Sequence, residues 1–296
     1  MDLNGKRAIV TGAAVGLGQA YARALANQGV HLALCDLRQE VHEVAAELNQ
    51  TDHITALAWQ GDVSDPQLVR TVVDGAVEQL GGIDILINNA GVWGASCADD
   101  DLDKSMFDYD KIVGTNLKGE YLFGRAVIAV MLAQGTGGDI VNIATDHMVT
   151  CGTPDDVCPK LPTCPWNQTP ASWPGPPRPT GGGDQMDLYD ASKWGLNGFL
   201  YAWAKALREH KVRVNAFCMG ATDSYMLRSF HNFEPTEQEV ASWMRAEDNA
   251  QALVDLLKEG PEGRNAQNMN FCIGRPVRLE PPNPQHYILM DDGGQA

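Results

Sequence analysis

Short apolar runs rich in β-branched residues alternate along this chain with segments of helical periodicity. In the first helical segment Leu17, Tyr21 and Leu25 recur every four residues, with Ala20 and Ala24 beside them on the same face. The pattern predicts strands at 8–11, 32–35, 54–59, 83–87, 140–144, 212–217 and 268–273, and further helices at about 39–48, 66–80, 117–133 and 188–209. Strands and helices that alternate in this way form βαβ units with right-handed crossovers. We therefore expect an α/β fold with a doubly wound parallel sheet, built as a single domain over 1–296.

One segment interrupts this alternation. Residues 151–187 contain nine of the 16 prolines, together with Trp166, Trp173 and the glycine run 181–183. Proline at this density excludes a regular helix and a central strand. Because a long amphipathic helix follows directly, we interpret 151–187 as an insertion into the domain and not as a linker.

A glycine-rich turn joins the first strand to the first helix. Gly12, Gly16 and Gly18 follow the strand at once. Glycines at these positions allow a tight turn and a close approach of the backbone to a pyrophosphate, which the unpaired N–H groups of a helix N-terminus favour. The turn alone is weak evidence, but strand, turn, amphipathic helix and second strand in succession predict a dinucleotide site.

The acidic residue that ends the second strand bears on the choice of dinucleotide. Asp36 stands where a carboxylate accepts hydrogen bonds from both ribose hydroxyls of adenosine, and its charge would repel a 2′-phosphate. Neither arginine nor lysine occurs at 13–15 to favour that phosphate, and Arg38 lies two residues beyond Asp36. These features predict NAD in preference to NADP, although Asp36 as an ordinary turn residue is the alternative. Asp62 and Val63 close the third strand, where an aspartate can meet the adenine amino group.

Five motifs occur in one order along the chain: the glycines of 12–18, Asn88-Asn89-Ala90-Gly91, Asn116, the segment 140–145, and Tyr189-Asp190-Ala191-Ser192-Lys193. Together they resemble the short-chain dehydrogenase/reductase family over roughly residues 5–225, apart from the insertion. The resemblance implies a single Rossmann-type domain that oxidises an alcohol or reduces a carbonyl with a nicotinamide cofactor. It also implies a homodimer or homotetramer.

Tyr189 and Lys193 are four positions apart on a predicted helix, so their side chains share one face. A free tyrosine has a pKa near 10, and a cation within about 5 Å lowers it by stabilising the phenolate. Tyr189 would then remove the alcohol proton as hydride leaves for the nicotinamide, or donate a proton in the reverse reaction. By resemblance, Lys193 also holds the nicotinamide ribose, and Asn116 holds a water that carries the proton onward. An isolated Tyr-x-x-x-Lys pair would be interpreted as an interfacial tyrosine beside a surface lysine, and only the other motifs favour catalysis.

Two departures from the family pattern concern the substrate. Thr145 replaces the usual serine after the fifth strand; it keeps the hydroxyl but adds a methyl group and a stiffer χ1. Its neighbours Asp146 and His147 either contact substrate or only begin a loop. The insertion separates Thr145 from Tyr189 by 44 positions, where the family has roughly a dozen. Its ends are therefore expected at the active-site mouth, where it forms either a lid or wall of the pocket, or a surface decoration or oligomer contact.

The expected site combines catalytic, cofactor and substrate residues. The catalytic residues are Thr145, Asn116, Tyr189 and Lys193. The expected cofactor contacts come from Gly12, Gly16, Leu17, Gly18, Asp36, Asp62, Val63, Asn88, Ala90, Gly91, Tyr189, Lys193, Gly220, Thr222 and Ser224. The expected substrate contacts are Thr145, His147, Trp93, Trp166 and Trp173. Residues 222–260 match the family's substrate-binding loop and helices, and their apolar side chains predict a substrate with a hydrophobic, cyclic or aromatic body.

The composition and net charge of the chain limit the classes of partner that it can bind. The chain has 22 basic and 38 acidic residues, a formal charge of −16, which repels nucleic acids and anionic membranes. No apolar run approaches the roughly 18 residues that span a bilayer. We therefore expect a cytoplasmic enzyme that acts on a small alcohol or ketone. The seven scattered cysteines, without a Cys-x-x-Cys, predict reduced thiols and neither disulfides nor a zinc site. The acidic run at 99–103 is interpreted as a solvated loop or helix start in preference to a cation site.

Two other functions are compatible with parts of the sequence. A catalytically silent, NAD-binding regulatory protein would keep the fold while the serine position drifts, but it would not need the Tyr189 and Lys193 pair. An epimerase or dehydratase of the wider superfamily keeps that pair, but usually has a larger substrate domain than the roughly 70 residues after Tyr225 allow.

Overall fold

The computed structural model describes residues 1–50, 53–149, 185–271 and 276–279. Within these residues seven parallel strands form one sheet in the order β3-β2-β1-β4-β5-β6-β7. The strands are β1 (Arg7–Thr11), β2 (His31–Asp36), β3 (Ala56–Gln60), β4 (Ile85–Asn88), β5 (Gly138–Thr145), β6 (Val212–Met219) and β7 (Asn268–Phe271). The order reverses between β1 and β4, and sheets of this class bind ligands at the carboxyl ends of such a pair.

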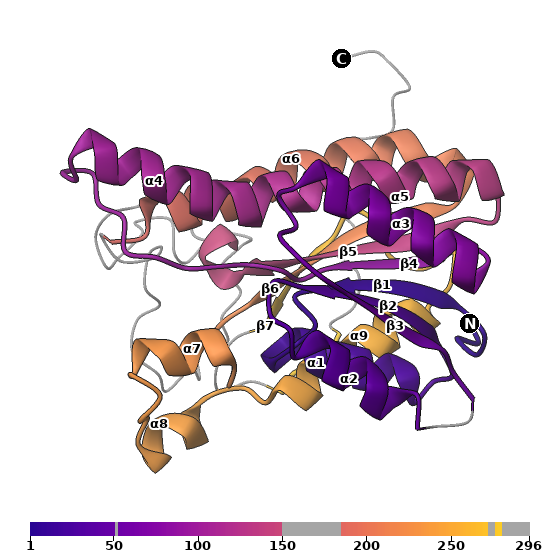
Figure 1. The fold of residues 1–296 in the computed structure, drawn as a ribbon, viewed down its shortest axis with the longest axis horizontal. Helices are drawn as coiled ribbons and strands as arrows, with labels where there is room; N and C mark the ends of the chain where they lie inside the picture. The colour runs from indigo at the N-terminus through magenta and orange to yellow at the C-terminus, as the bar shows by residue number, and fades with distance from the viewer. Residues whose placement is uncertain (51–52, 150–184, 272–275, 280–296) are drawn as a thin grey trace, which may run out of the picture.

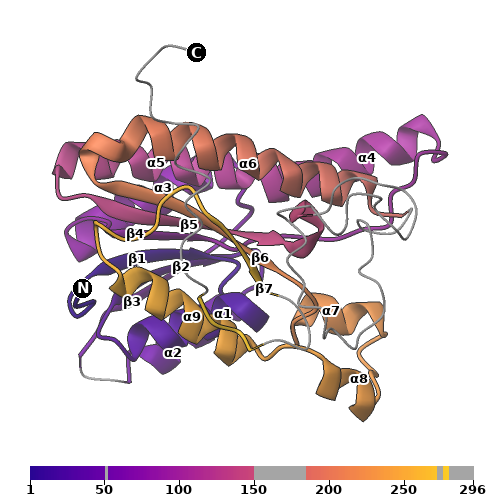
Figure 2. The ribbon, with the colours of Figure 1, turned by 180° about the vertical axis from the view of Figure 1, so that it is seen from behind.

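Helices cover both faces of the sheet (Figure 1). One face carries α1 (Gly16–Ala26), α2 (Val41–Leu48) and α9 (Ala246–Lys258), and the other carries α3 (Pro66–Leu80), α4 (Leu102–Val113), α5 (Glu120–Gln134) and α6 (Asp187–Leu207). The short helices α7 (Tyr225–Phe230) and α8 (Glu237–Ser242) lie beyond the carboxyl ends of the strands (Figure 2). The expected doubly wound α/β fold is confirmed.

The strands are apolar on both sides because both faces of the sheet are covered. Along β1, Ala8 and Val10 belong to a core shared with α1, α2 and α9, whereas Ile9 belongs to a second core shared with α3, α5 and α6. Side chains of a strand alternate between its faces, so each strand serves both cores. Every residue of β6 is buried.

The predicted strands agree with the structure to within one or two residues at their ends. Of the predicted strand at 268–273, β7 covers 268–271 and the rest lies outside the described residues. Helix α4 was not predicted, because its sequence is mostly polar and only Ile112 is buried. No helix in the described part of the chain combines the length and the apolar character that crossing a membrane requires.

The acidic run at 99–103 begins α4. The Asp101 carboxylate caps the helix by accepting a hydrogen bond from the backbone N–H of Lys104. The Lys104 ammonium in turn pairs with Asp100 at 2.6 Å and with Asp108 at 2.8 Å. Of the two interpretations of the run, the helix start is confirmed. Residues 151–184 of the predicted insertion lie outside the described residues.

Candidate active site

The turn between β1 and α1 has a backbone that favours glycine. Gly12 and Gly16 have φ of +65° and +59°, in the left-handed region. A Cβ on Gly12 would lie 2.8 Å from Cα of Ala90, and one on Gly18 would collide with the carbonyl oxygen of Gly12. Nδ2 of Asn89 holds the turn from the neighbouring strand by donating to the carbonyl of Gly12 at 3.0 Å. Packing as well as conformation therefore requires these glycines.

The N-terminus of α1 opens onto the crevice without a side-chain cap. Its N-cap residue is Val15, whereas α3 and α7 are capped by Asp65 and Ser224. Uncapped N–H groups, the positive end of a helix and a backbone free of Cβ atoms fit a pyrophosphate. The turn thus suits the dinucleotide that the sequence predicts. Leu17, which was predicted to contact it, packs partly against the core.

Asp36 is buried at the end of β2 and ties this edge to the glycine turn. Its Oδ2 accepts from the backbone N–H of Ala14, and its Oδ1 accepts from that of Arg38, both at 2.9 Å. A carboxylate keeps further lone pairs, so Asp36 can still accept from ribose hydroxyls. The Arg38 guanidinium is engaged elsewhere, because it pairs with Glu40 at 2.8 Å and lies 4.5 Å from the ring centroid of Tyr225.

The end of β3 lies at the same edge of the sheet. Asp62 is exposed, and its Oδ1 accepts from the backbone N–H of Ser64 at 2.8 Å. Val63 is buried, and a Cβ on Gly119 would lie 2.6 Å from its Cγ2. Their contact with adenine stays a prediction.

The segment after β4 lies at the carboxyl end of the sheet, next to the glycine turn after β1. Asn88 ends the strand and is fully buried. The backbone N–H of Ala90 donates to the hydroxyl of Thr11 at 3.0 Å. A Cβ added to Gly91 would lie 3.6 Å from Nζ of Lys193. Gly91 therefore packs close to the lysine ammonium.

Asn116 lies in a π-helical segment, Gly114–Gly119, between α4 and α5. Such segments frequently occur at functional sites. Its Oδ1 accepts from the backbone N–H of Val92 at 2.8 Å, and its Nδ2 donates to the carbonyl of Val92 at 2.9 Å and to the hydroxyl of Ser192 at 3.1 Å. The side chain thus joins the loop after β4 to α6, one residue before Lys193. Its role toward a water stays a prediction.

The Lys193 ammonium is buried where α6 meets β5 and α5. Lys193 is 4% exposed. Its Nζ donates to the carbonyl oxygen of Ile143 at 2.7 Å and lies 3.4 Å from Oε1 of Glu120. The cation is therefore shared with a carboxylate that the sequence did not point to.

Tyr189 lies one helical turn before Lys193 on α6, and the Thr145 hydroxyl acts to lower its pKa. The structure thus brings Thr145, Tyr189 and Lys193 to one edge of the sheet, with Asn116 bonded to Ser192 beside the lysine. The pKa of Tyr189 is nevertheless raised, and not lowered as the spacing of tyrosine and lysine predicted. Burial is the main cause, and the charges of three carboxylates add to it: those of Asp190, Asp146 and Glu120. The prediction had considered the lysine alone.

His147 pairs with Asp190 beside the tyrosine. It belongs to the short helix η2 (Asp146–Val149), and its Nδ1 lies 2.8 Å from Oδ1 of Asp190. Its ring lies edge-on to that of Tyr189, with 6.1 Å between centroids. Burial lowers the pKa of His147, but the hydrogen bond and the charge of Asp190 raise it overall. Contact with substrate stays a prediction for His147.

The polar groups of the turn after β6 form hydrogen bonds with neighbouring backbone groups. The backbone N–H of Gly220 donates to the carbonyl of Phe271 at 2.9 Å. The buried Thr222 hydroxyl donates to the carbonyl of Gly220 at 3.1 Å, and the Ser224 hydroxyl caps α7 by accepting from the N–H of Leu227. These contacts shape the turn, and its contact with the cofactor stays a prediction.

Aromatic side chains from distant segments meet above the crevice. Trp93, from the loop after β4, lies against Phe230 of α7, with 4.4 Å between ring centroids. Tyr225 and Phe233 form a second pair at 4.8 Å. The structure thus places Trp93 next to the 222–260 segment, as a shared pocket wall requires. Trp166 and Trp173 lie outside the described residues.

Three residues with clear roles at the site were not predicted as site residues. Thr11 and Asn89 hold the glycine turn, and Glu120 pairs with the lysine. Thr11 ends the predicted first strand, and Asn89 lies inside a motif that served only for recognition. Nothing in the sequence marked Glu120, because a charged residue within a helix is normally solvated.

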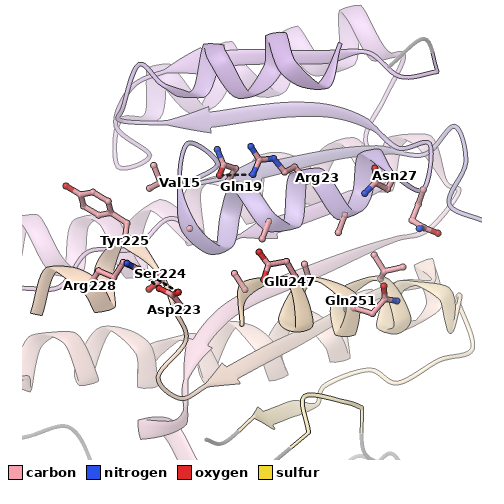
Figure 3. Close-up of a pocket in the computed structure, with 17 residues that line it drawn as sticks. Val15, Gln19, Arg23, Asn27, Asp223, Ser224, Tyr225, Arg228, Glu247 and Gln251 are labelled. Carbon is pink, nitrogen blue, oxygen red and sulfur yellow. Dashed lines mark hydrogen bonds and ion pairs between the residues drawn. The ribbon is translucent and has the colours of Figure 1, made fainter. Parts of the chain in front are cut away.

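A groove of about 670 Å³ runs between α1, α9 and α7 (Figure 3). Arg23 of α1 and Glu247 of α9 line its two sides, and Tyr225 closes the end next to Val15. Polar and apolar side chains both line its walls. Because it lies on the α1 face of the sheet, and Tyr189 comes from α6 on the other face, the groove is not the catalytic pocket.

Comparison with known proteins agrees with this geometry. A family model described as short chain dehydrogenase matches residues 6–150 and 180–235. The chain is 28% identical over 268 residues to galactitol 2-dehydrogenase of Agrobacterium fabrum, covering 90% of this chain and 87% of that protein.

Solved structures show the same fold. A 3-ketoacyl-(acyl-carrier-protein) reductase of Brucella melitensis, complexed with NADH, superposes with a TM-score of 0.69 at 25% identity and covers 93% of this chain and 99% of that one. A short chain dehydrogenase of Burkholderia cenocepacia, in complex with NADP, gives 0.67 at 28% identity and covers 92% and 98%. These similar structures therefore hold either nicotinamide cofactor.

Proposed function

The chain belongs to the short-chain dehydrogenase/reductase family of nicotinamide-dependent oxidoreductases, and from that premise we propose that it is an NAD-dependent alcohol dehydrogenase or carbonyl reductase. Its substrate would be a secondary alcohol or the corresponding ketone. The observation that carries the proposal is the convergence of Tyr189, Thr145 and Lys193 beside Gly91.

The chemistry assigned to these residues follows from their contacts. The Thr145 hydroxyl, close to Tyr189, would orient the reacting oxygen between the two. Tyr189 would take the proton from the alcohol or give it to the ketone, which is general acid–base catalysis. Lys193, held by Ile143 and Glu120, would present its remaining N–H toward the ribose. The nicotinamide, when bound, exchanges the hydride with the substrate carbon.

Three features support NAD over NADP. The Asp36 carboxylate lies at the end of β2 and would repel a 2′-phosphate. The nearby Arg38 guanidinium, which would favour that phosphate, is committed to Glu40 and Tyr225. Ala13 and Ala14 supply no cation.

The aromatic pairs around the crevice support a substrate with a hydrophobic, cyclic or aromatic body. Trp93 and Phe230 offer a continuous apolar surface on which such a body would lie. Galactitol 2-dehydrogenase acts, by its name, on a polyol, so polyols form the contrasting class of substrate.

The insertion is proposed to border this pocket. Its described flanks lie at the site: η2 contains His147 next to Tyr189, and the backbone N–H of Ser96, from the loop after β4, donates to the carbonyl of Gln185 at 3.1 Å. A segment joining these two points starts and ends beside the reacting groups. Contact of Trp166 and Trp173 with the substrate stays a prediction.

A homodimer is proposed through the α5 and α6 face. Tyr121 and Trp194 on these helices are each 42% exposed. Phe199 and Trp203 of α6 are stacked at 5.0 Å, and Tyr121 lies 5.4 Å from Phe199. Large apolar side chains exposed together on one face are typical of an interface between proteins.

The proposed function is tested by substrate turnover. A panel of aromatic, cyclic and linear secondary alcohols and polyols is assayed for NADH absorbance with wild-type protein and with Tyr189→Phe. We expect turnover on the cyclic or aromatic alcohols, a loss of about a hundredfold or more in Tyr189→Phe, and NADH binding unchanged by fluorescence titration. Retained turnover in the variant would refute the assigned acid–base group. Cofactor binding without turnover on any alcohol would instead favour the silent regulatory protein.

A further inference from the structure

Glu120 is a buried carboxyl group that the proposed reaction does not use. It begins α5, directly after the π segment that positions Asn116, and it is 3% exposed. Removing a carboxylate from water costs several kcal/mol unless a cation and hydrogen bonds compensate. Its cation is Lys193, with 3.4 Å between Oε1 and Nζ. Because burying the carboxylate costs free energy, its position beside Lys193 indicates that it acts on the lysine ammonium.

Only half of this carboxyl group is satisfied among the described residues. Oε1 faces Lys193, whereas Oε2 is buried without a hydrogen-bond partner there. The neighbouring amides are also incomplete: Asn88 donates to the carbonyl of Glu120 at 3.4 Å and to Asn142 at 3.1 Å, but Oδ1 of Asn88 and Nδ2 of Asn142 are unpaired within the same described part of the chain. These groups from β4 and β5 carry no charge and do not compensate that of Glu120.

The charged groups around Glu120 come from two sides. From α6, Lys193 attracts the carboxylate and Tyr189 lies within range of its charge. From η2 and from α6, Asp146 and Asp190 act on the same tyrosine. Burial outweighs the attraction of the lysine and raises the pKa of Glu120 to about 8. The group therefore changes charge close to neutral pH.

Lys193 has three N–H bonds to direct. One goes to the carbonyl of Ile143 and one toward Glu120. A Cβ added to Gly91 would lie 3.6 Å from Nζ, so Gly91 packs close to the ammonium. Glu120 and the carbonyl of Ile143 thus hold the ammonium in place.

We propose that Glu120 is a second ionisable group of the active site, a positioning residue that as a carboxylate holds the Lys193 ammonium and opposes the ionisation of Tyr189. This inference rests on the proposed function for the role of Tyr189. Protonation of Glu120 removes a negative charge that raises the pKa of Tyr189, and so favours the phenolate. The reaction therefore loses part of its tyrosine activation as pH rises through the range in which Glu120 ionises.

The first test measures the carboxyl group directly in the cofactor-free protein. Infrared difference spectra record the carbonyl band of protonated carboxylic acids as pH is raised, for wild type, Glu120→Gln and Asp139→Asn. Asp139 is the matched control: it is a buried carboxyl paired with Arg213 at 2.6 Å at the start of β5, and burial raises its pKa to about 6. We expect a band that disappears near pH 8, absent from Glu120→Gln and kept in Asp139→Asn. A band kept by Glu120→Gln would overturn the proposal.

The second test measures the effect on the tyrosine. The ratio of kcat/KM for Glu120→Gln to that for wild type should be near one at pH 6 and rise to about threefold above pH 8. If the pKa of the acid–base group falls by one unit, its ionised fraction rises by about tenfold. The phenolate is then a weaker base, which offsets part of the gain in rate. The factor should be equal for oxidation and reduction, because the overall equilibrium is unchanged. A ratio independent of pH would overturn the proposal and leave Glu120 a purely structural residue.

If Glu120→Gln does not fold, Glu120→Asp tests the proposal in its place. The shorter acid keeps the charge at a greater distance from Lys193, so its infrared midpoint should move while its pH dependence of kcat/KM stays closer to wild type. An unmoved midpoint would contradict the ion pair. Because the infrared titration needs no turnover, it tests Glu120 even if no alcohol is oxidised, and a failure of the proposed function remains distinguishable.

Discussion

Spacing predicted which residues meet at the site, but their surroundings decide what each can do. Tyr189 and Lys193 are neighbours, as four positions on a helix require. The pKa of the tyrosine is raised all the same, because burial and the carboxylates beside it outweigh the effect of the Thr145 hydroxyl. Asp190 and Glu120, which contribute to this field, come from different helices. One-dimensional spacing does not reveal the sum of such charges.

Asp36 provides a test of cofactor choice at the scale of one residue. Asp36→Ser removes the charge that would repel a 2′-phosphate but keeps a small acceptor for the N–H of Ala14. We expect the preference for NAD over NADP, measured as the ratio of kcat/KM, to fall by about tenfold, since one charge at close range in partly solvated surroundings is worth roughly 1–2 kcal/mol. Asp62→Ser, on the neighbouring strand end, is the control. An unchanged ratio in Asp36→Ser would show that the ribose contact was misplaced.

The His147 and Asp190 pair predicts a pH-dependent contribution to stability. The folded pKa of His147 is raised above its unfolded value, near 6.5, so its contribution is complete below that pH and is lost as pH rises through the folded pKa. Both side chains are 22% exposed. We therefore expect His147→Gln to lower the free energy of unfolding by less than about 1 kcal/mol at pH 5.5, and by much less at pH 9. Urea unfolding at the two pH values measures this. A larger loss at pH 9 than at pH 5.5 would contradict the sign of the shift.

At the scale of elements, polar segments were the hardest to predict. Buried strands such as β2 show as nearly unbroken apolar runs, because both faces of the sheet are covered. Helix α4 has a single buried residue, Ile112, so periodicity gave little signal, and its start is visible only through the cap at Asp101. The π segment at Asn116 has no counterpart in the sequence pattern, since it depends on contacts to Val92 and Ser192.

Comparing two glycines within helices distinguishes the effect of close packing from the effect of helix propensity. A Cβ on Gly18 of α1 would collide with the carbonyl of Gly12, whereas one on Gly198 of α6 would meet nothing within 4 Å. We expect Gly18→Ala to destabilise the fold by about 1–3 kcal/mol and to abolish NADH binding. Gly198→Ala should stabilise it by up to about 1 kcal/mol, because alanine favours a helix more than glycine does. Thermal unfolding and NADH fluorescence measure both, and similar effects of the two changes would contradict the close packing of the turn.

At the scale of the whole molecule, the helical layer on the α6 side leaves apolar surface without a partner. Tyr121 and Trp194 lie on two neighbouring helices and are not covered by the described residues. The net charge of −16 opposes the association of two copies, so burial of this face must outweigh that repulsion. The dimer should accordingly tighten as salt is raised.

Trp194→Glu tests this face. We expect a shift from dimer to monomer in sedimentation velocity, because a charge at a buried interface costs several kcal/mol. Leu37→Glu, at an exposed leucine on the connection between β2 and α2, is the control and should leave the mass unchanged. A dimer that persists in Trp194→Glu would place the interface elsewhere.

The sequence by itself determined the alternation of strands and helices, the glycine turn, and the order of the motifs along the chain. These depend on local conformation and on apolar periodicity, which neighbouring residues carry. Only the tertiary structure decided that Glu120 would face Lys193, that Arg38 would be committed to Tyr225, and that Trp93 would lie against Phe230. Each of these contacts joins residues far apart in the chain, and the electrostatic and packing energies that they supply depend on distance in space.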